Sequence, residues 1–294
     1  MNRHGGSSEG LLYMCWLYIT GVALMMLAAV VTGSSASHNP AQSNPHSMAV
    51  QRFSASTVLP SLVNSGSAMA SREQTFDFAN AGNVTVAQDW SGSLGGSVWH
   101  AGIILAHFID EHFPRLLRQC ASAAIQEATP LSLEVWQRRL RHNITGCSAV
   151  EIGSGATGLA SLVVSRLGGR AIATDGDAGV LLLLQRNLAN NIPSRIIHED
   201  GVAANRPDHW GATDSMRLEW GSRSAVELTQ KKLSEESSAA CEFPDIVVAA
   251  DVVYPSNSDA WGPLLDTFEM MCGPSTVALL AHTRRATEVR SRAL

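Results

Sequence analysis

A glycine-rich stretch near the middle of the chain is the first feature with the residue types of a binding site. Residues 151–158 read EIGSGATG and continue the short apolar run Ser148–Ile152. Glycines at the end of a strand allow the backbone to approach a ligand that crosses the strand end. The pattern also occurs in dinucleotide-binding turns and in ordinary tight turns, so it indicates a ligand site only in combination with other residues.

An acidic residue, Asp175, stands twenty positions after Gly155 and follows the apolar run Arg170–Thr174. A carboxylate there can accept hydrogen bonds from both hydroxyls of an adenosine ribose, each worth roughly 1.5–3 kcal/mol. The competing interpretation is a helix cap, a role that Asp177 would fill equally well. Glu151, two positions before the first glycine, is unusual for nicotinamide-dinucleotide binding, and no His or Lys follows in the context of a hydride relay.

The elements that must position these residues alternate between strand and helix. Continuous apolar runs predict buried strands, and amphipathic stretches predict helices. This alternation is typical of right-handed βαβ units, so the predicted fold is α/β, with a doubly wound and mostly parallel sheet. In such sheets ligands bind beyond the carboxyl ends of the strands. The predicted strands are 148–152, 170–174, 216–220, 245–250 and 276–282, and the predicted helices are 101–112, 132–142, 159–167, 179–190 and 261–271.

The composition supports a sizeable folded core and argues against two classes of protein. Hydrophobic residues make up 45% and charged residues 16% of the 294 residues, which excludes global disorder. The net charge of −5 argues against a protein that binds nucleic-acid phosphates. The five cysteines form no CxxC pair, so we expect neither a zinc ribbon nor a redox motif, and no metal site is predicted.

The N-terminal region differs from the rest of the chain. Leu11–Val31 carries no charge, and as a helix it would span about 31 Å, the thickness of the bilayer core. We therefore expect a hydrophobic helix over 1–32 that is either an uncleaved membrane anchor or a signal peptide for the secretory route or organelle import. If this segment is not used, the protein is expected in the cytoplasm.

A serine-rich stretch follows the apolar segment. Residues 33–72 contain 11 serines, two arginines and no Asp or Glu, so they cannot bury enough apolar surface to offset the entropy of ordering. This composition predicts a disordered linker over 33–75, and it also resembles an organelle transit peptide. The remaining residues, 76–294, are predicted to form the folded domain.

Four patches in order along this domain carry a resemblance to a known family. The core resembles the class I (seven-β-strand) S-adenosylmethionine-dependent methyltransferases, and most closely their non-histone protein-lysine methyltransferase family. The resemblance covers about residues 90–285. The patches are the glycine-rich segment from Gly92 to Trp99, the run AVEIGSGATGL at 149–159, LEWG at 218–221 and AADVVY at 249–254.

Position by position, the resemblance implies a set of site residues. Trp220 would cover the adenine face of S-adenosylmethionine, Ala250 would leave room for the cofactor, and Trp99 would shield the cationic sulfonium with its π face. Asp251 would accept a hydrogen bond from the substrate lysine amine, and Tyr254 would wall the lysine channel. The alternatives are core packing for the tryptophans and a structural cap for Asp251. The implied cofactor contacts are Trp99, Gly153, Ser154, Gly155, Asp175, Trp220 and Ala250.

The sequence departs from the family pattern in the glycine turn, in two connections at 114–146 and 193–213 that are longer than the family usually has, and at the C-terminus. Ala156 displaces the third glycine, Gly158, by one position, which predicts a wider turn. The chain also ends at Leu294, before the C-terminal β-hairpin that the resemblance implies, so the strand at 276–282 is expected to lie at an exposed sheet edge.

Three functions are therefore compatible with the sequence. The first is S-adenosylmethionine-dependent methyl transfer to a protein lysine. The second is methyl transfer to a small molecule or a nucleic acid, which the acidic balance and the lack of an N-P-P-Y type motif disfavour. The third is a catalytically inactive, membrane-tethered binding module, which the missing hairpin motivates.

Overall fold

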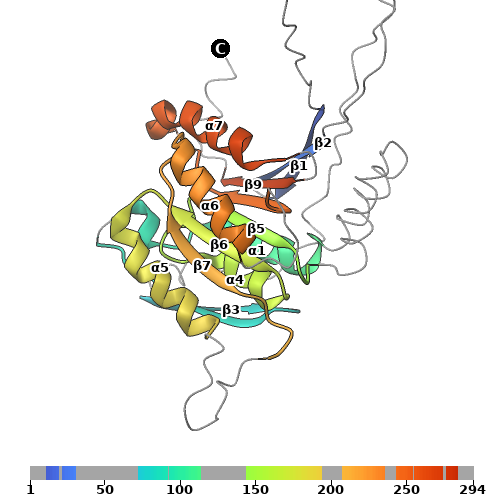
Figure 1. The fold of residues 1–294 in the computed structure, drawn as a ribbon. Helices are drawn as coiled ribbons and strands as arrows, with labels where there is room; N and C mark the ends of the chain where they lie inside the picture. Colours follow the sequence, from blue (N-terminus) through green and yellow to red (C-terminus); the bar gives the residue numbers. More distant parts are fainter. Residues whose placement is uncertain are drawn as a thin grey trace, which may run out of the picture.

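A seven-stranded sheet forms the centre of the protein in a computed structural model (Figure 1). The structure describes residues 11–19, 22–30, 72–91, 93–113, 144–193, 207–235, 243–253, 255–273 and 276–283 of the chain. The strands of the central sheet are β1 (Leu11–Ile19), β2 (Val22–Val30), β5 (Ser148–Ile152), β6 (Arg170–Asp175), β7 (Thr213–Arg217), β8 (Ile246–Ala250) and β9 (Val277–Thr283).

The strand order is β1-β2-β9-β8-β5-β6-β7. The five strands from β5 to β9 pair in parallel, whereas β2 runs antiparallel to β9 and β1 antiparallel to β2. The predicted α/β fold with a mostly parallel sheet is therefore confirmed. In such a sheet β5 and β8 are central, so the residues that follow them lie at the middle of the carboxyl edge.

Two hydrophobic cores sandwich the sheet. In β5, Ala149 contributes to one core and Val150 and Ile152 to the other, which is the alternation expected of a strand buried on both faces. Helices α1, α4 and α5 pack into the first core and helices α6 and α7 into the second. The bounds of these helices are α1 His100–Glu111, α4 Leu159–Arg166, α5 Ala178–Asn191, α6 Arg223–Glu235 and α7 Trp261–Met271.

The apolar N-terminal stretch does not form the expected helix. It forms the strands β1 and β2, and Val22–Ala28 pair with Val277–Thr283 of β9. An uncharged apolar sequence is compatible with a helix or with a strand. Here the backbone N–H and C=O groups of β9 pair with those of β2, and this pairing stabilises the strand conformation. The expectation that β9 is an exposed edge is therefore wrong, because β2 covers it. Among the described residues, the helices are too short or too polar to cross a bilayer.

A second, two-stranded sheet begins inside the stretch expected to be linker. Its strands are β3 (Glu73–Phe78) and β4 (Gly82–Ala87), which pair antiparallel and pack against α4 and α5. Glu73, Gln74 and Thr75 thus belong to a strand. Phe76 and Phe78 of β3 and Val84 and Val86 of β4 are buried in the first core, which stabilises the hairpin.

Most other predicted elements agree with the structure to within one or two residues. Helix α7 has the predicted bounds. Strand β7 begins three residues earlier than predicted, because its pairing with β6 runs from Ala171↔Thr213 to Asp175↔Arg217. The predicted helix at 132–142 and most of the predicted linker lie outside the described residues.

Candidate cofactor and active site

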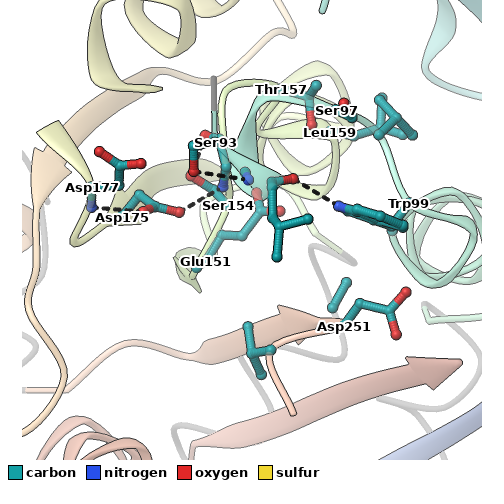
Figure 2. Close-up of a pocket in the computed structure, with 18 of the residues that line it drawn as sticks. Ser93, Ser97, Trp99, Glu151, Ser154, Thr157, Leu159, Asp175, Asp177 and Asp251 are labelled. Carbon is teal, nitrogen blue, oxygen red and sulfur yellow. Dashed lines mark hydrogen bonds between the residues drawn. The ribbon is translucent and has the colours of Figure 1, made fainter. Parts of the chain in front are cut away.

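The predicted site residues converge on one cleft at the carboxyl ends of β5, β6 and β8. The cleft has a volume of about 410 Å³, within the usual range of small-molecule sites, roughly 300–1,000 Å³. Figure 2 shows Asp175 and Asp177 on one side of it and Trp99 and Asp251 on the other. Its lining includes eight of the nine predicted residues, namely Trp99, Gly153, Ser154, Gly155, Asp175, Trp220, Ala250 and Asp251.

The glycine turn has the backbone geometry that only glycine adopts without strain. Gly153 has φ +67° and Gly155 has φ +59°, both in the left-handed region. A Cβ on Gly153 would lie 2.7 Å from Val252 Cγ1, and a Cβ on Gly155 would collide with the Gly95 carbonyl oxygen. The backbone N–H of Ala156 donates to that same carbonyl at 2.7 Å. The turn and the segment before α1 therefore pack backbone to backbone and form one wall of the cleft.

Asp175 ends β6 and is tied to the turn. One carboxylate oxygen accepts from the backbone N–H of Gly155 and the other from that of Asp177, both at 2.9 Å. Partial burial raises the pKa of Asp175 above its ordinary value, and these hydrogen bonds act in the opposite direction. A carboxylate offers about four acceptor positions, so both oxygens retain capacity for a ligand donor.

The helix cap that the sequence allows for either Asp175 or Asp177 is formed by Asp177. The Asp177 side chain accepts from the Gly179 N–H at 2.8 Å at the start of α5. A hydrogen bond from Ser93 is the main cause that lowers the pKa of this exposed carboxyl. Asp175 is thereby left to face the cleft, although Asp177 and Ser93 also line it.

A second acid lies deeper in the cleft. Glu151 is buried near the end of β5, and its Oε2 accepts from the Ser161 N–H of α4 at 2.8 Å. Burial raises the pKa of Glu151 to about 7, against the opposing effect of hydrogen bonds from Ser161. Its position before the glycines was the only sequence signal for this residue, and it was not predicted to belong to the site.

The two tryptophans border the cleft from different elements. Trp99 lies directly before α1, and its indole N–H donates to the Leu94 carbonyl at 3.0 Å, as Figure 2 shows. Trp220 follows β7 and packs partly against the second core, near Gly153. Both side chains are half-buried and line the cleft, so neither is purely a core residue.

Asp251 follows β8 and has an unusual backbone conformation. Its φ of 51° lies in the left-handed region, and its N–H donates to the Ala281 carbonyl at 2.8 Å. The two carboxylate oxygens accept from the N–H and the hydroxyl of Thr283, each at 2.7 Å. Asp251 therefore joins the ends of β8 and β9 while it lines the cleft. Tyr254, the other residue expected to bind the substrate, lies outside the described residues.

The described lining suits a cationic nucleoside derivative. It contains four carboxyl groups, on Glu151, Asp175, Asp177 and Asp251, and no Lys, Arg or His. The alanine at the end of β8 is partly exposed to the cleft, and two indoles border it. Carboxyl groups and indoles are the groups that attract a sulfonium, an ammonium or a ribose diol, all of which S-adenosylmethionine presents.

Comparison with known proteins identifies a family for this chain. A family model described as lysine methyltransferase matches residues 79–292. The mouse (Mus musculus) protein N-lysine methyltransferase METTL21A is 29% identical over 208 residues, which cover 70% of this chain and 69% of that protein. The mouse protein-lysine methyltransferase METTL21E is 26% identical over 204 residues, which cover 69% of this chain and 62% of that protein.

Solved structures include a SAM-dependent methyltransferase from Agrobacterium tumefaciens, with 12% sequence identity and a TM-score of 0.34. The match covers 92% of this chain and 71% of that one. The family model spans well over half of the chain and includes every predicted site residue. The chain therefore belongs to the lysine methyltransferase family, and S-adenosylmethionine is its cofactor.

Proposed function

We propose that this protein transfers the methyl group of S-adenosylmethionine to the ε-amino group of a lysine in a protein substrate. The observation that carries the proposal is the meeting of the glycine turn, Asp175 and Trp220 in one cleft at the carboxyl ends of neighbouring strands. The names and the family of the relatives support a lysine side chain as the acceptor.

The cofactor roles that we propose follow the two ends of the cleft. At one end Asp175 accepts from the ribose hydroxyls, and Trp220 covers the adenine. At the other end Trp99 faces the sulfonium, whose positive charge is attracted to the negative face of an indole. Gly153, Ser154 and Gly155 supply backbone close to the ligand, and Ala250 leaves room for it at the end of β8. The cofactor supplies an activated methyl group when it is bound.

The protein's contribution to methyl transfer is then mainly positional. A lysine amine has an unperturbed pKa near 10.4, so it must lose its proton before it attacks the methyl carbon. A cleft that excludes water favours the neutral amine, and alignment at about 3–3.5 Å supplies most of the remaining effect. We propose that Asp251, which keeps acceptor capacity beside its bonds to Thr283, orients the amine. We propose Tyr254 as the wall of the lysine channel.

The test is direct. The full chain is titrated with S-adenosylmethionine by isothermal calorimetry, and it is then incubated with methyl-labelled cofactor and cell extract. Mass spectrometry should find methylated lysines in protein, and Asp175→Ala should abolish both binding and transfer. Label in small molecules or nucleic acid alone would identify the second function considered above. Cofactor binding without any transfer would identify an inactive binding module.

A further inference from the structure

Two asparagines in the second half of α5 are buried, although asparagine in a helix usually faces solvent. Asn187 is 1% and Asn191 is 4% exposed, and they lie one turn apart on the face that meets the β3–β4 hairpin. Figure 1 shows α5 and the hairpin side by side at the lower part of the molecule. Burying an amide is costly unless its donors and acceptor are all used, so the partners of these two side chains explain their presence.

Both amides bind the free edge of β4 as a neighbouring strand would. Asn191 accepts from the Thr85 N–H at 3.1 Å and donates to the Thr85 carbonyl at 2.7 Å. Asn187 accepts from the Ala87 N–H and donates to the Ala87 carbonyl, both at 2.8 Å. Four residues of helix and two residues of strand each advance roughly 6–7 Å, which allows the second pair to repeat the geometry of the first.

The two residues differ in the use of their second N–H. Asn191 donates it to the carbonyl of Asn187 within the helix, at 2.8 Å. Asn187 donates it to the carbonyl of Ala156, also at 2.8 Å. Ala156 belongs to the glycine turn, and its own N–H is bound to the Gly95 carbonyl. The Ala156 residue is thus held from both sides, by α5 and by the segment that leads to Trp99.

We propose that Asn187 is a positioning residue for S-adenosylmethionine. Asn187 is not among the residues that line the cleft. Its side chain binds Ala156, the residue after Gly155, and the N–H of Gly155 in turn binds Asp175. Removing Asn187 therefore deletes the bond that ties the turn to α5, and it leaves the bonds of the turn to Asp175 and Gly95 as the remaining restraints on its position. This inference rests on the proposed cofactor site and names a residue that controls its geometry.

Asn191 provides a matched control for the experiment. Asn187→Ala and Asn191→Ala each delete a pair of bonds to β4, but only Asn187→Ala deletes a bond to the turn. In the full chain we expect similar losses of stability against urea without cofactor. The Kd for S-adenosylmethionine, measured by isothermal calorimetry at a temperature where both variants are folded, should rise about tenfold or more for Asn187→Ala. It should change less than about twofold for Asn191→Ala.

An isosteric variant keeps the test decisive if alanine disturbs the fold. Asn187→Leu has a side chain of the same shape and no charge, and it cannot donate to the Ala156 carbonyl, so its Kd should rise at least as much, whereas Asn191→Leu should leave the Kd nearly unchanged. Equal changes in Kd for the 187 and 191 variants, or wild-type affinity in Asn187→Leu, would overturn the inference while the cofactor site stands. A wild-type chain that binds no S-adenosylmethionine would overturn the proposed function and this inference together.

Discussion

Glu151 makes the stability of the protein depend on pH in a direction that the structure fixes. Burial raises the pKa of this carboxyl from its ordinary value of 4.5 to about 7 in the folded state. The folded protein therefore holds a proton that the unfolded chain releases between these two pH values. The stabilising contribution of that proton is complete below pH 4.5 and is lost as the pH rises through 7.

The size of this effect follows from the linkage relation. At about 1.36 kcal/mol per pH unit, the difference between the two pKa values amounts to roughly 3 kcal/mol. Glu151→Gln keeps the shape and an acceptor for the Ser161 N–H but carries no titratable proton. We expect the variant and the wild type to have similar free energies of unfolding near pH 5. Near pH 8 the variant should be more stable by about 2–3 kcal/mol.

Urea denaturation of the cofactor-free full chain at pH 5, 6, 7 and 8 measures this difference. The partly buried group His107 also titrates, but it is present in both proteins and cancels from the comparison, whereas the charge of Asp175 contributes to the raised pKa of Glu151 and so belongs to the effect that is measured. Glu227→Gln, an exposed position on α6, is the control and should follow the wild type at every pH. A difference between Glu151→Gln and wild type that stays constant from pH 5 to 8 would refute the reasoning.

Three further predictions concern the walls of the cleft and the edge of the sheet. Gly155→Ala places a Cβ on a residue with left-handed backbone, next to the Gly95 carbonyl. It should lower the free energy of unfolding by about 2 kcal/mol or more and weaken cofactor binding. A calorimetric Kd for S-adenosylmethionine equal to that of the wild type would contradict this. Thr283→Val removes the hydroxyl that donates to Asp251 and keeps the backbone N–H that also donates to it, and should cost about 1–3 kcal/mol in urea denaturation; no change would show that the hydroxyl adds nothing to stability. Deleting residues 1–32 uncovers the edge of β9, and should lower the thermal midpoint and increase aggregation measured by light scattering; an unchanged midpoint would show that the β2–β9 pairing adds nothing to stability.

The central strands are predictable because their sequences favour strands and their central place in the sheet requires buried strands. Residues 246–250 are apolar throughout, and residues 149–152 are apolar apart from Glu151, a pattern typical of strands that are buried on both faces. The hairpin β3–β4 also had a signal, since Phe76 and Phe78 alternate with polar residues before a turn at Gly82, but the signal is short and adjoins a serine-rich stretch. For Leu11–Val31 the sequence favours a helix on length alone, and only the place of β9 in the sheet decides otherwise.

Some residues of the site could be predicted from their spacing in the sequence, whereas others are identified only by their packing in the structure. Asp175 was predictable because a strand end and a distance of twenty residues from Gly155 determine where its carboxylate lies. Asn187 was not, because an asparagine in a helix predicts a solvent-exposed side chain, and its partners Ala87 and Ala156 are 100 and 31 residues away.

The same reasoning explains why Asp251 has two roles at one position. An aspartate at φ 51° is strained, and it is held there by its own N–H bond to Ala281 together with the two bonds from Thr283. Those bonds also fix the carboxylate at the carboxyl end of β8, beside Ala250 and on the same side of the cleft as Trp99 (Figure 2). A side chain that must orient an amine within a few tenths of an ångström benefits from such a fixed base. The bonds from Thr283 therefore orient Asp251, and its remaining acceptor positions are available to the substrate amine that we propose it binds.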